Sequence, residues 1–333
     1  MIALPPAGNR RHTALADWVE LELLFGESAT LSHVELLDVL TDDPGGDTTD
    51  EDVAQLEAIY GDRIDDEFIA QRRNDARTQA EEGISGPEQI VEATWLELAF
   101  REQVVGDAYP VRVNDGLATG SGDWWQTTSY AFLTMLAARV AYGLELPVQE
   151  PARLFEELVT VALEAYTGGE AVRFGWPHNR DEFPTDFKKA ARELAHRLGE
   201  KPGGMEAIGT NAKDYALDVV AWRGFSDERR GQHILLCQCA TGKDWNEKVI
   251  SERGWEKVID FTVAPTRSVA FPFVPSREEA DVIQWLDVAF KGGVPFDRLR
   301  IASLAADVAV GPSLMDDMRK WVNVAQESLP QDQ

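Results

Sequence analysis

Two short apolar segments, DVVAW (218–222) and HILLCQ (233–238), constrain the fold of this chain more than any other feature. Both have the length and composition of buried strands, and RGFSDERRG, a link rich in turn-forming residues, joins them. SVAFPF (268–273) is a third segment of the same kind. Together with the helical patterns around them, these segments predict an α+β or α/β architecture.

Helical patterns surround these strands. Apolar periodicity predicts helices at 151–166 and 186–200, and Thr13 is predicted to cap a helix near the N-terminus. Further helices are predicted near 50–60, 64–82 and 87–104, and one buried helix that contains Trp124 and Trp125 is predicted at 124–143. Pro147 and Pro151 mark a boundary, so we expect a mainly helical domain at 1–150 and a sheet-containing domain at 151–333.

Charge is distributed unevenly between the two halves. The 333 residues carry a formal net charge of −26. Residues 1–170 contain 10 Arg, no Lys and 33 acidic residues, a balance of −23, and residues 171–333 contain 22 basic and 25 acidic residues, a balance of −3. The nearly neutral half can present a basic surface to phosphates. The acidic half is either a solvated surface or a docking face for a basic protein partner.

The sequence favours a cytoplasmic protein without a membrane partner. No apolar run approaches the roughly 20 residues that cross a bilayer, and the N-terminal residues lack the apolar core of a signal peptide. The two cysteines, Cys237 and Cys239, lie two positions apart on one predicted strand, where a disulfide is geometrically unfavourable. The five histidines are far apart in sequence, so we expect the cysteines to be apolar fillers rather than zinc ligands.

Polar residues stand at the ends of the two main strand segments. Asp218 begins the first segment and Gln238 ends the second, so we expect their side chains to lie side by side across a hairpin. Glu193, on the predicted helix at 186–200, would add a second carboxylate. Such oxygen ligands suit Mg²⁺, or Mn²⁺ in its place. Lys243 or Lys248 would supply an ammonium that stabilises charge on a reacting phosphate.

The order of these residues resembles the PD-(D/E)XK nuclease superfamily, and more closely its Mrr-like restriction endonucleases. The matching stretches are RELAHRLG (192–199), KDYALDVVAW (213–222) and ILLCQCA (234–240), so the resemblance covers roughly residues 185–275. It implies a restriction-endonuclease-like mixed sheet flanked by helices, which acts on DNA with Mg²⁺. It also implies that Asp218 and Gln238 are metal ligands and that Glu193 is the helix carboxylate, for which Glu156 and Glu157 are alternatives.

This chain departs from the family at one position. The family's catalytic Lys would stand at position 240, where this chain has Ala240. Lys243 follows in the TGKD turn, and Lys248 follows five residues later, so either long side chain can supply the ammonium. We expect Lys243 to do so, because Gly242 allows a sharp turn that brings the next side chain back toward the strand end.

Two functions follow from the residues and the resemblance. The first is a metal-dependent DNA endonuclease in bacterial anti-phage defence or restriction, with the acidic half as a regulatory or partner-docking domain. The alternative is a catalytically inactive subunit of the same fold that binds DNA or assembles a defence complex. An RNase of this fold and a homo-oligomer are also compatible with the sequence.

Overall fold

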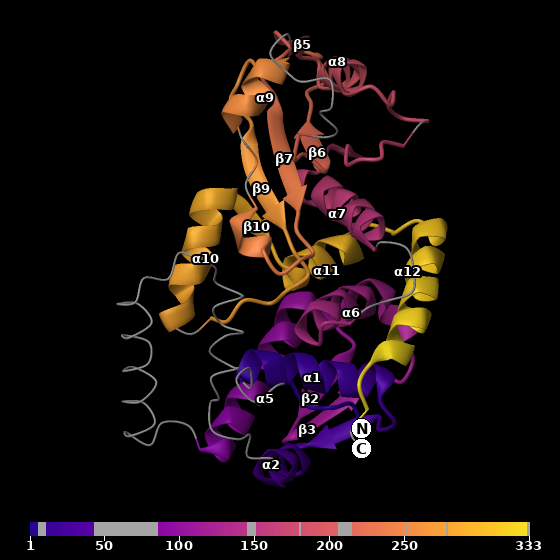
Figure 1. Cartoon of the computed structure of the whole chain (residues 1–333), viewed down its shortest axis with the longest axis vertical. Helices are drawn as coiled ribbons and strands as arrows, with labels where there is room; N and C mark the ends of the chain where they lie inside the picture. The colour runs from indigo at the N-terminus through magenta and orange to yellow at the C-terminus, as the bar shows by residue number, and fades with distance from the viewer. Residues whose placement is uncertain are drawn as a thin grey trace. The chain divides into compact units, whose positions relative to one another are not determined.

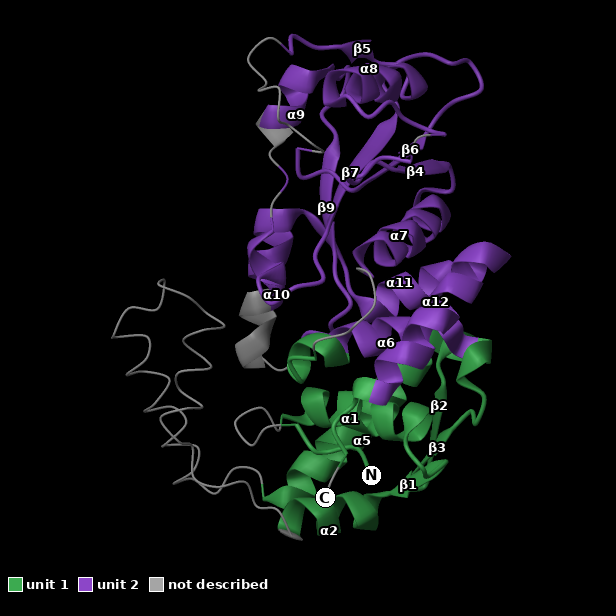
Figure 2. Cartoon of the chain, turned by 45° about the vertical axis from the view of Figure 1, so that its right-hand side comes forward, with its two compact units in different colours: residues 1–126, 138–144, 328–333 green, residues 127–137, 145–327 purple. Residues whose placement is uncertain are grey.

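The computed structural model describes residues 1–5, 11–42, 86–144, 151–179, 181–205, 215–248, 250, 252–277 and 279–331 (Figure 1). The chain forms two compact units, coloured separately in Figure 2. Unit 1 comprises 1–126, 138–144 and 328–333, and unit 2 comprises 127–137 and 145–327. The helices that the sequence predicts at 50–60 and 64–82 lie outside the described residues.

Unit 1 combines helices with a small antiparallel sheet. Its elements are α1 (His12–Phe25), β1 (Thr30–Ser32), α2 (His33–Asp42), α5 (Pro87–Val105), η3 (Gly106–Ala108), β2 (Val111–Asn114), β3 (Leu117–Gly120) and most of η4 (Trp124–Thr127). The strands pair in the order β1-β3-β2. The sequence patterns did not predict this sheet, since its strands are only three or four residues long.

Two expectations for the first half of the chain are wrong in detail. The N-cap of α1 is Arg11 and makes no side-chain capping bond, so Thr13 lies inside the helix instead of capping it. The predicted helix at 124–143 is η4 followed by α6 (Thr128–Ala141). Trp124 is buried, but Trp125 is 43% exposed and stacks on Trp124 at a centroid distance of 4.9 Å. Trp125 is therefore not a core residue.

A buried ionic cluster joins α1 to α5 within unit 1. The fully buried Arg101 guanidinium lies 2.6 Å from Asp17, 2.9 Å from Glu20 and 3.0 Å from Glu97. Tyr109 also donates its hydroxyl hydrogen to Glu20 at 2.8 Å. Buried charges are tolerated only when they are paired and hydrogen-bonded, so each member of this cluster depends on the others.

Unit 2 is built around a five-stranded mixed sheet. Its elements are most of α6, then α7 (Ala152–Thr167), β4 (Glu170–Arg173), α8 (Phe187–Arg197), β5 (Lys201–Pro202), β6 (Val219–Arg223), β7 (His233–Cys239), η5 (Trp245–Glu247), α9 (Glu252–Val258), β8 (Ile259–Asp260), β9 (Thr266–Ala270), α10 (Glu279–Gly292), β10 (Val294–Phe296), α11 (Arg298–Asp307), α12 (Pro312–Ala325) and η6 (Gln326–Ser328), the last of which ends in unit 1. The strand order is β10-β9-β7-β6-β4. The pairs β4–β6 and β6–β7 are antiparallel, and β7–β9 and β9–β10 are parallel. The predicted mixture of helices and strands is therefore confirmed.

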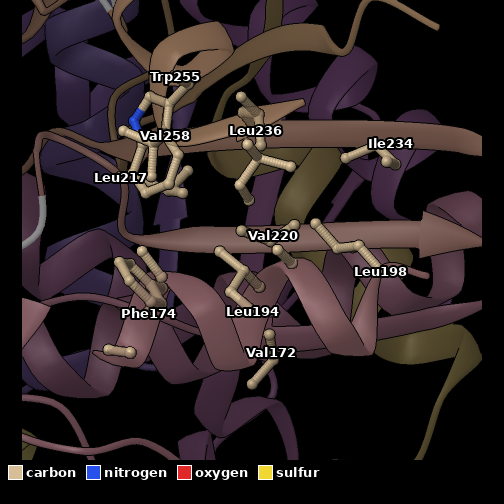
Figure 3. Close-up of a cluster of buried hydrophobic side chains, with 14 of the residues drawn as sticks. Val172, Phe174, Leu194, Leu198, Leu217, Val220, Ile234, Leu236, Trp255 and Val258 are labelled. Atoms are coloured by element: carbon tan, nitrogen blue, oxygen red, sulfur yellow. The ribbon is translucent and has the colours of Figure 1, made fainter. Parts of the chain in front are cut away.

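The predicted strands and helices of this unit form because their apolar residues face a shared core. Leu194 of α8 and Leu198, the residue after this helix, pack beside Val220 of β6 and Ile234 of β7 (Figure 3). The same buried cluster includes Trp255 and Val258 of α9. Asp186 caps α8, as its carboxylate accepts the Lys189 backbone N–H at 2.9 Å.

A different helix packs on the remaining side of these strands. α7 contacts β4, β6 and β7, but its buried residues do not belong to the cluster that α8 and α9 form. Alternation along β7 separates Ile234 and Leu236, which face α8 and α9, from Cys237. The two faces of the sheet are thus covered by different helices.

Candidate active site at the end of strands β6 and β7

Asp218 lies immediately before β6, and its backbone is held from both sides. Its N–H donates to the Cys237 carbonyl at 3.0 Å, although Cys237 already pairs with Val219. Asp218 is therefore an extra residue at the strand entrance, as in a β-bulge. Its carbonyl accepts the N–H groups of Phe174 at 2.7 Å and Gly175 at 3.0 Å, just beyond β4. This bonding leaves the backbone of Asp218 little freedom.

The Asp218 carboxylate reaches the neighbouring strand. Its Oδ2 accepts the backbone N–H of Cys239, the residue after Gln238, at 2.7 Å. The structure therefore brings Asp218 and Gln238 to the same end of the β6–β7 pair. Joint binding of one metal ion by the two side chains stays a prediction.

The chain enters Asp218 through an unusual turn. Tyr215 and Ala216 have φ values of 55° and 59°, in the left-handed region that residues other than glycine seldom adopt. The Trp255 indole donates to the Tyr215 carbonyl at 3.1 Å and helps to hold this turn. Such strain costs about 1–3 kcal/mol per residue and occurs preferentially at functional sites. The strained turn therefore adds to the reasons for placing the site at Asp218.

Gln238 has a buried oxygen that the rest of the described structure does not satisfy. Along β7 it alternates with Ile234 and Leu236, which places it on the face covered by α8 and α9. Its Oε1 is buried and has no hydrogen-bond partner among the described residues. An unsatisfied buried polar atom costs about 1–3 kcal/mol. A cation or a water molecule at Oε1 would remove that cost.

Glu156 is the helix carboxylate that lies against the sheet. It is buried on α7, and its Oε2 accepts the Arg173 Nε–H at 2.6 Å. Arg173 pairs with Val219, the residue after Asp218. A Cβ on Gly175 would lie 2.3 Å from Oε2 of Glu156, so the absence of a side chain at Gly175 makes room for this carboxylate.

The other two candidate helix carboxylates have surface roles. Glu157 forms an i,i+4 ion pair with Arg153, and both side chains are partly exposed. Glu193 is 44% exposed on α8 and lies 3.4 Å from Arg197. The structure therefore favours Glu156 over Glu193, the residue that the sequence resemblance suggested. Arg173 was not predicted at all, because an isolated Arg in EAVR carries no recognisable motif.

Both candidate lysines are exposed, and neither forms an ion pair with the described residues. Two residues after Lys243, Trp245 packs on Phe271 with ring centroids 4.3 Å apart. This contact anchors the turn after β7 on the side of β9. Ala240 is buried in the same apolar cluster, where a Lys side chain would lose its hydration. The small residue at position 240 therefore has a packing reason.

The pKa of the Cys239 thiol is affected by its surroundings. Burial raises the pKa of the Cys239 thiol well above its ordinary value, and the neighbouring Cys237, Asp218 and Glu156 raise it further. Both cysteines are free thiols.

We expect the folded protein to react slowly with a thiol reagent at mildly alkaline pH, because burial and nearby negative charge disfavour the Cys239 thiolate. Labelling should accelerate on the order of 10-fold or more in denaturant. The variants Cys237→Ser and Cys239→Ser assign the two signals. Rapid labelling of Cys239 in the folded protein would contradict the raised pKa of its thiol.

The donor set of the site is small. Within the described residues, no three His, Cys, Asp or Glu side chains gather closely enough to hold a metal ion. The available oxygen donors are the carboxylate of Asp218, the amide of Gln238 and the carboxylate of Glu156, which Arg173 already neutralises in part. A divalent ion at this position would therefore rely on one carboxylate more than on any other group.

No protein-family model, curated protein or solved structure matches this chain. Among the described residues, no helix is both long and apolar enough to cross a membrane.

Proposed function

We propose that this chain is a Mg²⁺- or Mn²⁺-dependent DNA endonuclease with its active site at Asp218. The observation that carries the proposal is the position of this carboxylate. It lies where β6 begins, is fixed by the Cys239 N–H, and follows a strained turn. A mixed sheet with helices on both faces supports the fold that the PD-(D/E)XK resemblance implies. The proposed setting is bacterial restriction or anti-phage defence.

The residues at the site fit a hard divalent cation. Asp218 and Gln238 would hold it, since one offers a carboxylate and the other a buried oxygen without a partner among the described residues. Glu156 would approach from α7, which covers the other face of the sheet from Gln238, so it would join them only at the strand ends and only if Arg173 released it. When bound, such an ion polarises the phosphate and lowers the pKa of a bound water. In this proposal the protein's own side chains hold the phosphate in the orientation that the reaction requires.

Lys243 is the proposed source of the ammonium that stabilises charge on the phosphate. Replacing Lys243 with Met keeps the side-chain stem and removes the charge, so the cleavage rate should fall by about 10²-fold. Lys248→Met is the matched control, because it makes the same change on another exposed lysine nearby. The measurement is the single-turnover rate of DNA cleavage with Mg²⁺. If Lys248→Met alone is inactive, Lys248 has this role. Full activity in both variants would show that neither lysine supplies the ammonium that the family's Lys would provide at position 240.

A second candidate function is a non-catalytic DNA-binding or assembly subunit of the same fold. The ion pair of Glu156 with Arg173 favours it, because the guanidinium occupies an oxygen that a metal would need. The absence of cleavage of duplex and single-stranded DNA and RNA, with either metal, would support this candidate over the endonuclease. The acidic residues of the first 170 positions would then serve to bind a basic protein partner.

A further inference from the structure

The outward face of α8 carries a cluster of basic side chains. At 100° per residue, Lys188, Lys189, Arg192 and His196 fall on one arc of about 100° around the helix axis. Lys189, Arg192 and His196 are exposed, and Lys188 is half-buried. We call these four residues the α8 basic face. It is locally positive although the whole chain is strongly acidic.

Three acidic residues in or next to α8 are already engaged with other groups. The Asp186 carboxylate caps the helix through the Lys189 N–H. Glu193 pairs with Arg197, and the buried Glu200 pairs with Arg230 at 2.6 Å. In contrast, Lys188, Lys189 and Arg192 form no ion pair with any described residue. Their charges are therefore available to an external anion.

The α8 basic face begins next to the candidate site. Phe187, the first residue of α8, lies 6.2 Å from Tyr215 and 6.1 Å from Trp255, measured between ring centroids. Tyr215 belongs to the strained turn that leads into Asp218. The first basic residues of α8 thus directly follow an aromatic residue that packs on the turn leading into Asp218.

The side chains of the α8 basic face indicate which class of ligand it can bind. All large apolar side chains of α8 are buried in the core of unit 2, so the face offers nothing to insert into a lipid bilayer. From Lys188 to His196 the helix rises about 12 Å, and one strand of a DNA duplex presents a phosphate about every 3.4 Å along the axis. The length of the face thus matches a run of about four phosphates along one strand.

We propose that the α8 basic face binds the phosphate backbone of duplex DNA beside the Asp218 site. This inference rests on the proposed endonuclease function and names the surface that would hold its substrate. The contacts are electrostatic and involve no base edge, so the binding is independent of sequence and weakens with added salt.

The test uses the full chain with Lys188, Lys189 and Arg192 all changed to Gln. Binding of a labelled DNA duplex is measured by anisotropy over a range of salt concentrations, with EDTA present to prevent cleavage. We expect the dissociation constant at low salt to rise on the order of 10-fold or more, and the slope of log K against log salt to become shallower by about 2–3.

The matched control changes Arg112, Arg153 and Lys320 to Gln. These three side chains are partly to largely exposed, carry the same total charge and lie on other elements. The control should bind DNA like the wild-type protein. Equal losses of DNA affinity in both triple variants would show that the effect comes from net charge alone, and would overturn the proposal. Unchanged binding by the α8 variant, or no DNA binding by the wild type, would also overturn it.

Two further arms separate this inference from the proposed function. Vesicles that contain anionic lipid should not bind the wild-type protein, and binding to vesicles instead of DNA would overturn the inference. If the α8 variant loses DNA binding but the wild type never cleaves DNA, the surface is correct and the endonuclease function is wrong. If the α8 variant binds normally and the wild type cleaves, the endonuclease stands and the assigned surface is wrong.

Discussion

Asp218→Asn should reduce metal-dependent DNA cleavage by at least about 10³-fold while the protein remains folded. Asparagine keeps an oxygen that can accept the Cys239 N–H, the bond that Asp218 makes at 2.7 Å. It removes the negative charge, which is the main attraction that the site offers to a divalent cation. The measurement is the cleavage rate at saturating Mg²⁺, together with the thermal unfolding temperature of each protein.

Asp227→Asn is the control for this substitution. Asp227 is an exposed carboxylate in the link between β6 and β7, and it takes no part in the candidate site. The control should cleave at the wild-type rate. EDTA should stop cleavage reversibly in the control and in the wild-type protein. Wild-type activity in Asp218→Asn would refute the active site proposed above. The Asp218→Asn variant should still bind DNA, because binding is measured in EDTA and therefore does not depend on the metal ion.

Arg101→Met should destabilise unit 1 by about 3–5 kcal/mol. The substitution keeps most of the side-chain volume but leaves Glu20 and Glu97, both buried, without the guanidinium that neutralises them. A buried carboxylate that loses its cation costs much more than a lost surface contact. Urea unfolding followed by tryptophan fluorescence measures the effect, since α1 and α5 of unit 1 contain Trp18 and Trp95.

The control for Arg101→Met is Arg112→Met in the same unit. Arg112 is 45% exposed and pairs with Glu102 at 3.3 Å. An exposed ion pair contributes about 0–1 kcal/mol, so this variant should unfold almost like the wild type. Similar small losses in both variants would show that the Arg101 cluster is dispensable. A shift of only the transition assigned to unit 1 would also show that the units unfold separately.

Elements with a strong and local apolar pattern can be predicted from the sequence. β6 and β7 follow from two apolar runs that a turn-rich link joins, and α7 and α8 follow from helical periodicity. Asp218 and Gln238 can be identified as candidates because a polar residue at the end of a buried strand is in a common position for catalytic groups. The same local logic placed the turn after β7 and the lysine that follows it.

Other features depend on partners that are distant in sequence and become visible only in the fold. β4 and β10 have four and three residues, too few to produce a period, and they form because β6 and β9 offer unpaired backbone groups. Periodicity does not say which carboxylate meets the sheet; packing of α7 buried Glu156 beside Arg173, while Glu157 and Glu193 remained partly exposed.

The Arg101 cluster shows the physical reason for this limit. Its partners on α1 lie 81 and 84 positions away in sequence, so no local pattern identifies them. A buried charge is stable only after folding brings all of its partners together. Sequence patterns report the local preferences of a segment, whereas the choice of a distant partner belongs to the folded chain as a whole.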